Sequence, residues 1–233
     1  MRIKTGLALV TLSLLSAIAP AKAATYTFEG NNLGGKTRTG DHTNILTTYN
    51  NNTNQFTWSS TYTDNGSGPL AEGAWLVVSS GENPRKNVDE YAILYLDGAN
   101  EQVSIYNYSG QNNAYSYNTE QFLGSTALNV INNGSERTFE FALDATDINN
   151  NDSFGDEWKG IAFGDEIGLW FHGAGDLTTS YKQDGSLETF SAGTTGWFDS
   201  ENETATAVPE PGSVAALGLF AIAAAAKRRQ RLG

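Results

Sequence analysis

Short runs of alternating apolar and polar residues dominate this chain and indicate a β fold. Between residues 25 and 200, such runs are separated by Gly, Asn, Asp and Ser. Alternation with a period of two is typical of strands that bury one face, and the separating residues tolerate the positive φ angles of tight turns. The expected strands are residues 25–29, 54–63, 73–80, 90–97, 102–109, 114–122, 127–131, 137–144, 159–164, 166–173 and 195–200.

Helical periodicity is not sustained over three turns anywhere in this region, and at most a turn or two of helix is expected at residues 144–149, DATDIN. Strands of this length and spacing predict an all-β fold, a single antiparallel β-sandwich of jelly-roll-like type over residues 24–200. Residues 201–207 lose the apolar pattern, and we expect them to form a linker.

The N-terminal residues have the pattern of a secretory signal peptide. Arg2 and Lys4 precede an uncharged, mainly apolar run over residues 6–19, and Ala21-Lys22-Ala23 supplies the small residues that signal peptidase requires. We therefore expect residues 1–23 to be removed by signal peptidase and the remainder to be exported.

The charge of residues 24–207 limits the partners of the exported part. This region has 7 Lys and Arg against 25 Asp and Glu, a net charge of −18. Nucleic acids and anionic membrane surfaces both require a cationic footprint, so nucleic acid is not an expected partner. The chain has no cysteine, which excludes disulfides, thiol catalysis and thiolate metal sites.

The C-terminal residues 208–233 form a second segment of distinct character. Two prolines, at 209 and 211, interrupt any regular element; an uncharged run over 212–226 and a basic cluster over 227–231 follow. The run is short for a membrane span, but a basic cluster directly behind such a run holds the end of a span in the cytoplasm. These features predict a single C-terminal transmembrane helix.

Val208-Pro209-Glu210-Pro211, the short apolar run and the Arg-rich end together resemble the PEP-CTERM sorting signal of exosortase substrates. The resemblance implies that Pro209, Glu210 and Pro211 are the recognition element and that exosortase is a partner. It implies a transient stay in the inner membrane, then transfer to the cell envelope, surface or extracellular matrix of a bacterium with an outer membrane. Many such bacteria make extracellular polysaccharide. The resemblance is limited to this tail and indicates an address, not an activity.

Aromatic side chains share one face of several expected strands. In residues 90–97, Tyr91 and Tyr95 alternate with aliphatic residues, and in residues 166–173 Trp170 and His172 do the same. Exposed Trp and Tyr rings suit sugars, whose C–H faces stack on them while polar neighbours bind the hydroxyls. Tyr91, Tyr95, Trp170 and His172 are therefore candidate sugar-binding residues. The alternative interpretation is that these rings only cover the second face of the sheet.

Oxygen-bearing side chains are concentrated in residues 144–157. Asp147, Asn149, Asn151 and Asp152 alternate in part like the ligands of a calcium loop, and calcium is the only cofactor that the sequence suggests. The pattern departs from an EF-hand, because Asp152 occupies the glycine position and Trp158 the position of the bidentate glutamate. The alternative is a solvated turn made of turn-forming residues.

Catalytic motifs are weak. No nucleophile elbow accompanies the two histidines, and adjacent carboxylates such as Asp165-Glu166 point to opposite faces of a strand. We expect no enzymatic activity and assign no catalytic residue; a glycan hydrolase using Glu140 or Asp165 is the less favoured alternative. The expected function is a structural or polysaccharide-associated role at the surface or in the matrix, with a lectin-like carbohydrate-binding module as the alternative.

Overall fold

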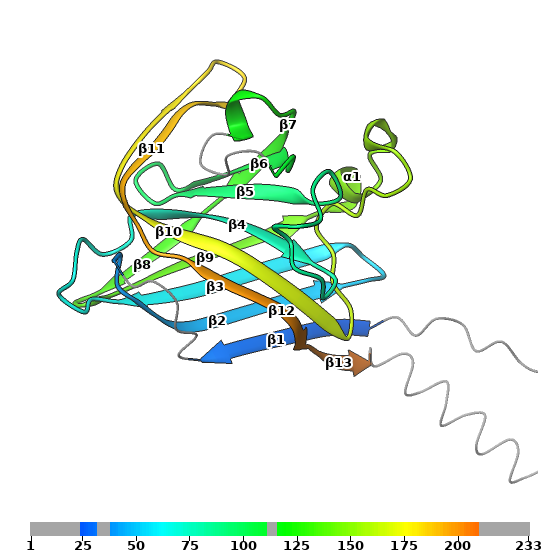
Figure 1. The fold of residues 1–233 in the computed structure, drawn as a ribbon, viewed down its shortest axis with the longest axis horizontal. Coiled ribbons are helices and arrows are strands. Elements are labelled where there is room, and N and C mark those ends of the chain that lie inside the picture. The colour runs from blue at the N-terminus through cyan, green and yellow to red at the C-terminus, as the bar shows by residue number, and fades with distance from the viewer. Residues whose placement is uncertain (1–23, 32–37, 111–115, 210–233) are drawn as a thin grey trace, which may run out of the picture.

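The computed structural model describes residues 24–31, 38–110 and 116–209. These residues form an all-β fold of two antiparallel sheets packed face to face (Figure 1), which confirms the predicted antiparallel sandwich. The predicted signal peptide over residues 1–23 and the predicted span over residues 212–226 lie outside the described residues. Within the described part of the chain, no helix is long and apolar enough to cross a membrane.

The first sheet has six strands in the order β13-β1-β2-β3-β9-β8. Their bounds are Thr206–Pro209 (β13), Ala24–Asn31 (β1), Asp41–Asn50 (β2), Gln55–Thr63 (β3), Glu136–Asp144 (β9) and Asn129–Asn133 (β8).

The second sheet has seven strands in the order β11-β10-β4-β5-β6-β7, with β12 also paired to β10. Their bounds are Leu187–Thr195 (β11), Glu166–Tyr181 (β10), Gly73–Ser79 (β4), Ala92–Asp97 (β5), Gln102–Asn107 (β6), Phe122–Ala127 (β7) and Phe198–Thr204 (β12). Three helical turns complete the description: η1 (Ser116–Asn118), α1 (Thr146–Asn149) and η2 (Asp152–Phe154). The turn of helix expected at DATDIN is α1.

The connections differ from the expected jelly-roll type. Strands β1 to β3 follow one another in the first sheet, and β4 to β7 follow one another in the second. The chain therefore forms meanders within each sheet and changes sheets only between β3 and β4, β7 and β8, β9 and β10, and β12 and β13. The β2–β3 and β5–β6 connections are short turns over residues 51–54 and 98–101, whereas β1–β2, β4–β5 and β6–β7 are joined by longer connections.

Alternating side chains of both sheets meet in the inter-sheet core. Phe56, Trp58, Phe139 and Phe141 come from the six-stranded sheet, and Leu94, Leu96, Leu169 and Phe171 are among their partners from the other. His42 lies in this core as well, with its ring centroid 4.3 Å from that of Phe171 and 4.5 Å from that of Tyr62. Burial of one face of each strand is what the period-two pattern predicted.

Several strand predictions were wrong. Strands β2, β7 and β11 were not predicted, whereas residues 114–122 and 159–164 were expected to be strands. Of those, residues 116–118 form the turn η1, and Gly160 takes part only in an isolated bridge with Tyr91. Inward-facing Ile45, Thr47 and Tyr49 hold β2 in place, but polar Thr47 on the inner face and apolar Leu46 on the outer face concealed the alternation.

The expected linker over residues 201–207 is strand instead. Glu203 pairs with Ile167 in β12–β10, and Thr206 to Pro209 pair with Thr27 to Ala24 in β13–β1. Ala205, at the crossing between the two sheets, is buried, and its N–H donates to the carbonyl of Asp165. The sandwich therefore extends to Pro209, held in this part by backbone pairing that an apolar pattern does not reveal.

Candidate functional site

The outer face of the seven-stranded sheet carries the aromatic residues that the sequence singled out. Tyr91, Tyr95 and Trp170 all point to this face, opposite the aliphatic residues of the same strands, as the alternation predicted. They belong to a second hydrophobic cluster, which we call the aromatic cluster. Its buried members are Trp75, Val77, Tyr91, Ile93, Tyr95, Tyr106, Tyr108, Tyr117, Trp170, Ala174, Leu187 and Phe190.

The expected exposure of these rings was wrong. Tyr91 is 0%, Tyr95 1% and Trp170 1% exposed, so none of the three offers a ring face to a sugar. The rings cover the second face of the sheet, as the alternative interpretation expected. The position of His172 differs, because this residue is only half-buried.

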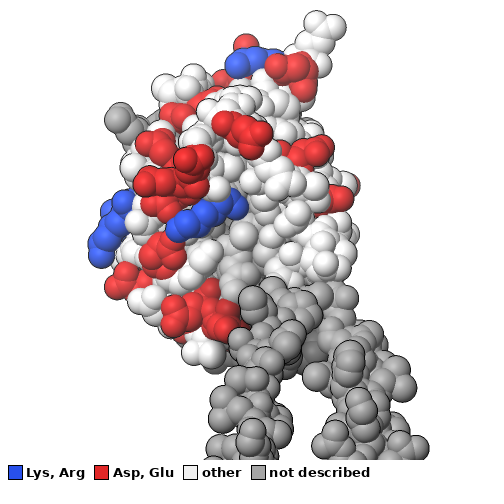
Figure 2. All heavy atoms as spheres, turned by 90° about the vertical axis from the view of Figure 1, so that its right-hand side faces the viewer, with Lys and Arg blue, Asp and Glu red and all other residues white. Residues whose placement is uncertain are grey.

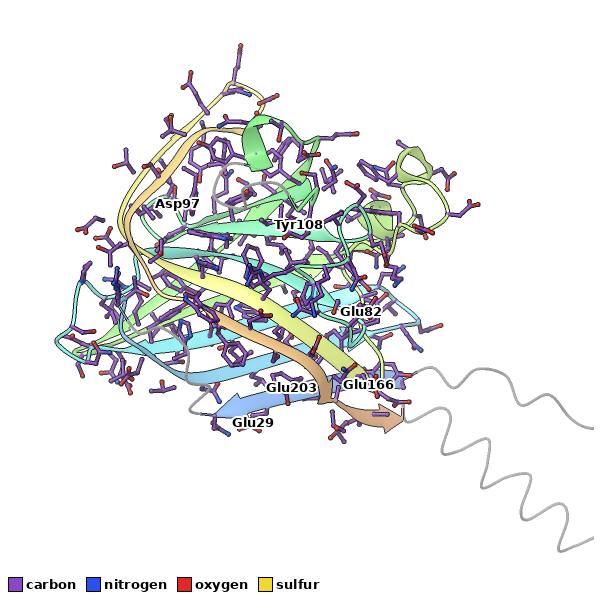
Figure 3. All side chains as sticks on the ribbon, in the orientation of Figure 1. Glu29, Glu82, Asp97, Tyr108, Glu166 and Glu203 are labelled. Carbon is purple, nitrogen blue, oxygen red and sulfur yellow. The ribbon has the colours of Figure 1, made fainter. Side chains whose placement is uncertain are left out.

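A long hairpin covers the aromatic cluster. Strand β10 continues past the sheet, and Asp176 adopts a positive φ of 52° there, which redirects the strand toward the cluster. Phe190 in β11 then lies 5.1 Å from Tyr95 and 6.1 Å from Trp75 between ring centroids. The Leu187 N–H donates to the Tyr106 hydroxyl at 2.6 Å. Tyr181, which pairs with Leu187, donates its hydroxyl to Asp97 (labelled in Figure 3) at 2.8 Å.

A charged network closes the face near Tyr91. The Lys159 ammonium donates to Glu82 at 2.7 Å, to Glu90 at 2.8 Å and to the Tyr91 oxygen at 3.0 Å. The Tyr91 hydroxyl itself donates to the carboxylate of Glu82. Burial acts to lower the pKa of Lys159, but these acceptors outweigh it and raise that pKa above its usual range. Tyr91 thus serves as a structural link between loops.

One margin of the aromatic face stays open, and we call it the tryptophan margin. His172 stacks on Trp75 with a centroid distance of 4.7 Å and an interplanar angle of 15°. The Gly196 N–H donates to the Gly173 carbonyl, and Phe198 pairs with Phe171, so Trp197 lies across from His172 on the same face. Trp197 is 39% exposed. A buried ring in β4, a half-buried ring in β10 and an exposed ring directly before β12 therefore follow one another.

Polar groups flank the tryptophan margin. Asp199 pairs with Trp170 in the next row, and its Oδ2 lies 3.8 Å from the Arg85 guanidinium. Asp199 Oδ1 and His172 Nδ1 are buried and have no hydrogen-bond partner among the protein groups. Burial raises the pKa of Asp199, and the charge of Arg85 opposes that rise. Burial lowers the pKa of His172 to about 4, so its imidazole is neutral at pH 7.

Sequence reasoning placed two of these residues in the candidate site and missed the others. Trp170 and His172 were predicted. Trp170 contacts His172 edge to face at 4.9 Å between ring centroids and stacks on Tyr108 (labelled in Figure 3) at 5.8 Å. Trp197 and Asp199 were missed, although they alternate with Phe198 in the predicted strand TGWFDS. Tyr95 is not part of the margin, because it packs against Tyr106, Tyr117 and Phe190.

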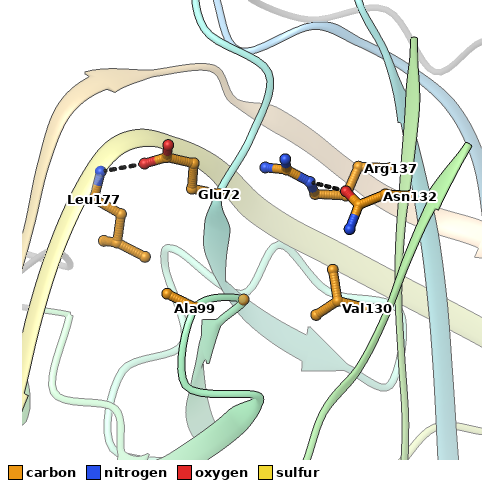
Figure 4. A pocket seen from close by; sticks show the side chains of 7 residues that line it. Glu72, Ala99, Val130, Asn132, Arg137 and Leu177 are labelled. Carbon is orange, nitrogen blue, oxygen red and sulfur yellow. Dashed lines mark hydrogen bonds between the residues drawn. The ribbon is translucent and has the colours of Figure 1, made fainter. Parts of the chain in front are cut away.

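A hollow of about 300 Å³ lies at an open end of the sandwich (Figure 4). Glu72 stands at one side and accepts a hydrogen bond from the Leu177 N–H at 2.8 Å. Arg137 stands at the other and donates to Asn132 at 2.7 Å and to the Ala71 carbonyl at 2.6 Å. Val130, Ala99 and Leu177 supply apolar walls. The hollow thus presents a carboxylate and a guanidinium on opposite sides of an apolar floor.

The loop with the predicted calcium ligands is held by its own side chains. Asn149 Oδ1 accepts from the Ile161 N–H at 2.8 Å, and Asn151 Oδ1 accepts from the Ser153 N–H at 3.1 Å. Asp147 lies in α1 and Asp152 in η2. Among the residues that the structure describes, no group of three or more His, Cys, Asp or Glu is arranged to hold a metal. Calcium binding at these four residues stays a prediction.

The two carboxylates considered for hydrolysis lie in separate elements. Glu140 points away from the core, as predicted, and accepts hydrogen bonds from Asn129 at 3.1 Å and Ser59 at 3.4 Å. Asp165 lies in the loop before β10. Neither belongs to the tryptophan margin or to the hollow.

The sorting residues lie at or beyond the end of the described fold. Pro209 is the last residue of β13 and pairs with Ala24, whereas Glu210 and Pro211 fall outside the described residues. No family model matches this chain, and neither a curated protein nor a solved structure shows significant similarity to it.

Proposed function

We propose that the protein is an exported, non-enzymatic component of the cell surface or extracellular matrix that associates with polysaccharide. The observation that supports this most directly is the tryptophan margin, where exposed Trp197 adjoins half-buried His172 and the partly exposed carboxylate of Asp199. A flat ring beside fixed polar groups is the arrangement that binds the C–H face and the hydroxyls of a sugar.

The charge of the domain defines the class of polysaccharide. A net charge of −18 over residues 24–207 repels anionic polymers, and acidic side chains greatly outnumber basic ones on the face shown in Figure 2. The margin contains one local cation, Arg85, already engaged with Asp199. The preferred partner is therefore an uncharged polysaccharide.

The position of the chain ends suits display from a surface. Ala24, the expected first residue after signal cleavage, pairs with Pro209, the first proline of the sorting motif. Export through the signal peptide, transient anchoring by a transmembrane helix over residues 212–226 and recognition of Pro209 to Pro211 by exosortase are all part of the proposal. The signal peptide and the C-terminal anchor would then both be attached at the β1–β13 edge of the six-stranded sheet. The tryptophan margin, which lies on the other sheet, would stay accessible.

The test is binding of the full-length protein to the host's own extracellular polysaccharide, measured by co-sedimentation with and without calcium. Trp197→Ala should lose most of the bound fraction, and Trp197→Phe should retain part of it because a ring remains. Leu46→Ala is the matched control, since Leu46 is similarly exposed, at 41%, but lies on the other sheet. Equal binding by Trp197→Ala and Leu46→Ala would refute the margin as the site. A calcium requirement would support the predicted calcium loop.

The hollow favours a second candidate, a lectin-like module for a small saccharide. Its volume of about 300 Å³ fits a single sugar ring, and Glu72 and Arg137 offer acceptors and donors across it. Glu72→Gln keeps the acceptor for Leu177 N–H and removes the charge. Saturable calorimetric binding of monosaccharides that Glu72→Gln weakens and Trp197→Ala leaves unchanged would favour this candidate over the margin.

A further inference from the structure

Strand β8 ends the six-stranded sheet with less protection than the edge strands β13 and β7 have. Its sequence, Asn129-Val-Ile-Asn-Asn133, contains neither charge nor proline, and its pairing with β9 is regular. Strand β13 is only four residues long and ends in Pro209, and β7 pairs irregularly with β6. Proteins commonly protect edge strands with charges, prolines, bulges or short length. An unprotected edge therefore indicates a pairing surface.

The turn that joins β8 to β9 determines which backbone groups of β8 point outward. Asn133 pairs with Glu136, so Gly134 and Ser135 form a two-residue loop, and Gly134 has a φ of 62°. In such hairpins the closing pair is hydrogen-bonded, and hydrogen-bonded pairs alternate along the ladder. Asn133, Ile131 and Asn129 therefore bond to β9. The N–H and C=O groups of Val130 and Asn132 point away from the sheet, where no further described strand lies.

These outward groups are self-complementary. In an antiparallel pair of β8 strands with a two-fold axis at Ile131, Val130 of one copy lies opposite Asn132 of the other. The two residues then exchange both backbone hydrogen bonds, and the symmetry gives four such bonds per pair of chains. On the outer face Ile131 meets Ile131, and Asn129 meets Asn133. No like charges are placed opposite each other.

We propose that β8 is a self-association strand that joins the six-stranded sheets of two copies of this chain into one continuous sheet. Ile131 supports the proposal because it is 45% exposed, among the largest exposures of the apolar side chains, and it lies on the expected axis. Pairing of two copies would cover it. This inference does not rest on the proposed polysaccharide association.

Cysteine cross-linking of the full-length protein tests both the contact and its register, because the chain has no cysteine of its own. The axis places the two Ile131 Cβ atoms about 5 Å apart, which is close enough for a disulfide. Under mild oxidation Ile131→Cys should form a covalent dimer, seen at twice the monomer mass on a non-reducing gel. Leu46→Cys is the matched control and should give several-fold less, since Leu46 is equally exposed but lies on β2.

The register is tested by mixing variants. Asn129→Cys and Asn133→Cys should each fail to cross-link alone and should cross-link when mixed, because each faces the other across the axis. Failure of Ile131→Cys to exceed Leu46→Cys would overturn the proposal. Efficient cross-linking of Asn129→Cys with itself would overturn the stated register. Circular dichroism of every variant checks that the β fold is retained.

A second measurement avoids oxidation. Ile131→Lys places two ammonium groups face to face and should shift the protein to monomer in sedimentation velocity, whereas Leu46→Lys should leave the dimer fraction unchanged. A wild-type protein that sediments as a monomer at all accessible concentrations would refute the proposal.

Discussion

The outer faces of the two sheets follow the same alternation rule, but one face is largely covered and the other is exposed to solvent. On the seven-stranded sheet the outward residues are aromatic, and the β10–β11 hairpin covers them to form a second core. On the six-stranded sheet they are mainly Thr, Ser and Asn, paired across strands, as in Thr48 to Thr57 at 2.7 Å and Thr61 to Thr138 at 2.9 Å. The composition of an outward face, more than its position, thus indicates whether another element covers it.

The largest expected effect is the loss of a ring from the covered face. Trp170→Ala removes a side chain that is 1% exposed and contacts Tyr108 and His172, so we expect about 3–5 kcal/mol of lost stability in urea unfolding. Leu46→Ala on the uncovered face should change stability by less than about 0.5 kcal/mol. Similar effects for the two substitutions would abolish the distinction between the faces.

The pH dependence of stability should also differ between the two regions. His42 lies between the sheets, whereas His172 lies on the outer face of the seven-stranded sheet. Burial lowers the pKa of His42 to about 4, and neither of its nitrogens has a partner among the protein groups. The unfolded chain binds this proton more readily, so the contribution of neutral His42 is complete above about pH 6.5 and is lost as the pH falls toward 4. The lowered pKa of His42 corresponds to a difference of about 3 kcal/mol in the free energy of unfolding between these two pH values.

His42→Phe keeps a ring against Phe171 and removes the titration. Urea unfolding between pH 4 and pH 7 should therefore show a flatter dependence for this variant than for the wild type. His172→Phe is the comparison variant, and because His172 is half-buried its effect on the slope should be smaller. An unchanged slope in His42→Phe would mean that His42 already accepts its proton in the folded protein.

The smallest expected effect concerns the loops over the aromatic cluster. Lys159→Met removes the cation that joins Glu82 and Glu90, and the loss should be at most about 1 kcal/mol because the Lys159 side chain is 42% exposed. The difference should shrink in 1 M salt, where the screening length is about 3 Å. Lys182→Met, in an exposed turn, is the control. A loss that salt does not reduce would indicate packing of the Lys159 stem as the main cause.

Much of the sheet architecture could be predicted from alternation alone. Residues 90–97 and 137–144 were assigned the correct element type, and the inward faces of both followed from their apolar residues. Strand β2 was not predicted because its inward Thr47 is polar and its outward Leu46 is apolar, and β13 because pairing with β1 depends on backbone groups. The local sequence of a strand does not show which distant strand its backbone groups pair with.

The candidate site was only partly predictable for a similar reason. Periodicity correctly placed Tyr91, Tyr95, Trp170 and His172 on one face, but it could not show what covers them. Phe190, which is distant in sequence, packs on Tyr95, whereas Lys159 and Glu82 bond to Tyr91 and Tyr108 stacks on Trp170. Trp197 carried a usable signal, since it alternates with buried Phe198 next to a glycine. In such sequences, an aromatic residue at the end of a covering strand, such as Trp197 after β11, is the more informative candidate.

The pairing of β1 with β13 determines when the six-stranded sheet can be completed during folding. Among the described residues, Ala24 is synthesised first and its pairing partner Pro209 last. Until then one side of β1 offers unpaired backbone groups, and the contact that closes the sheet spans almost the entire domain. Such long-range closure slows folding and prolongs exposure of an open edge. Completion of the six-stranded sheet therefore requires residues 206–209, so a chain truncated before them would retain an unpaired edge at β1.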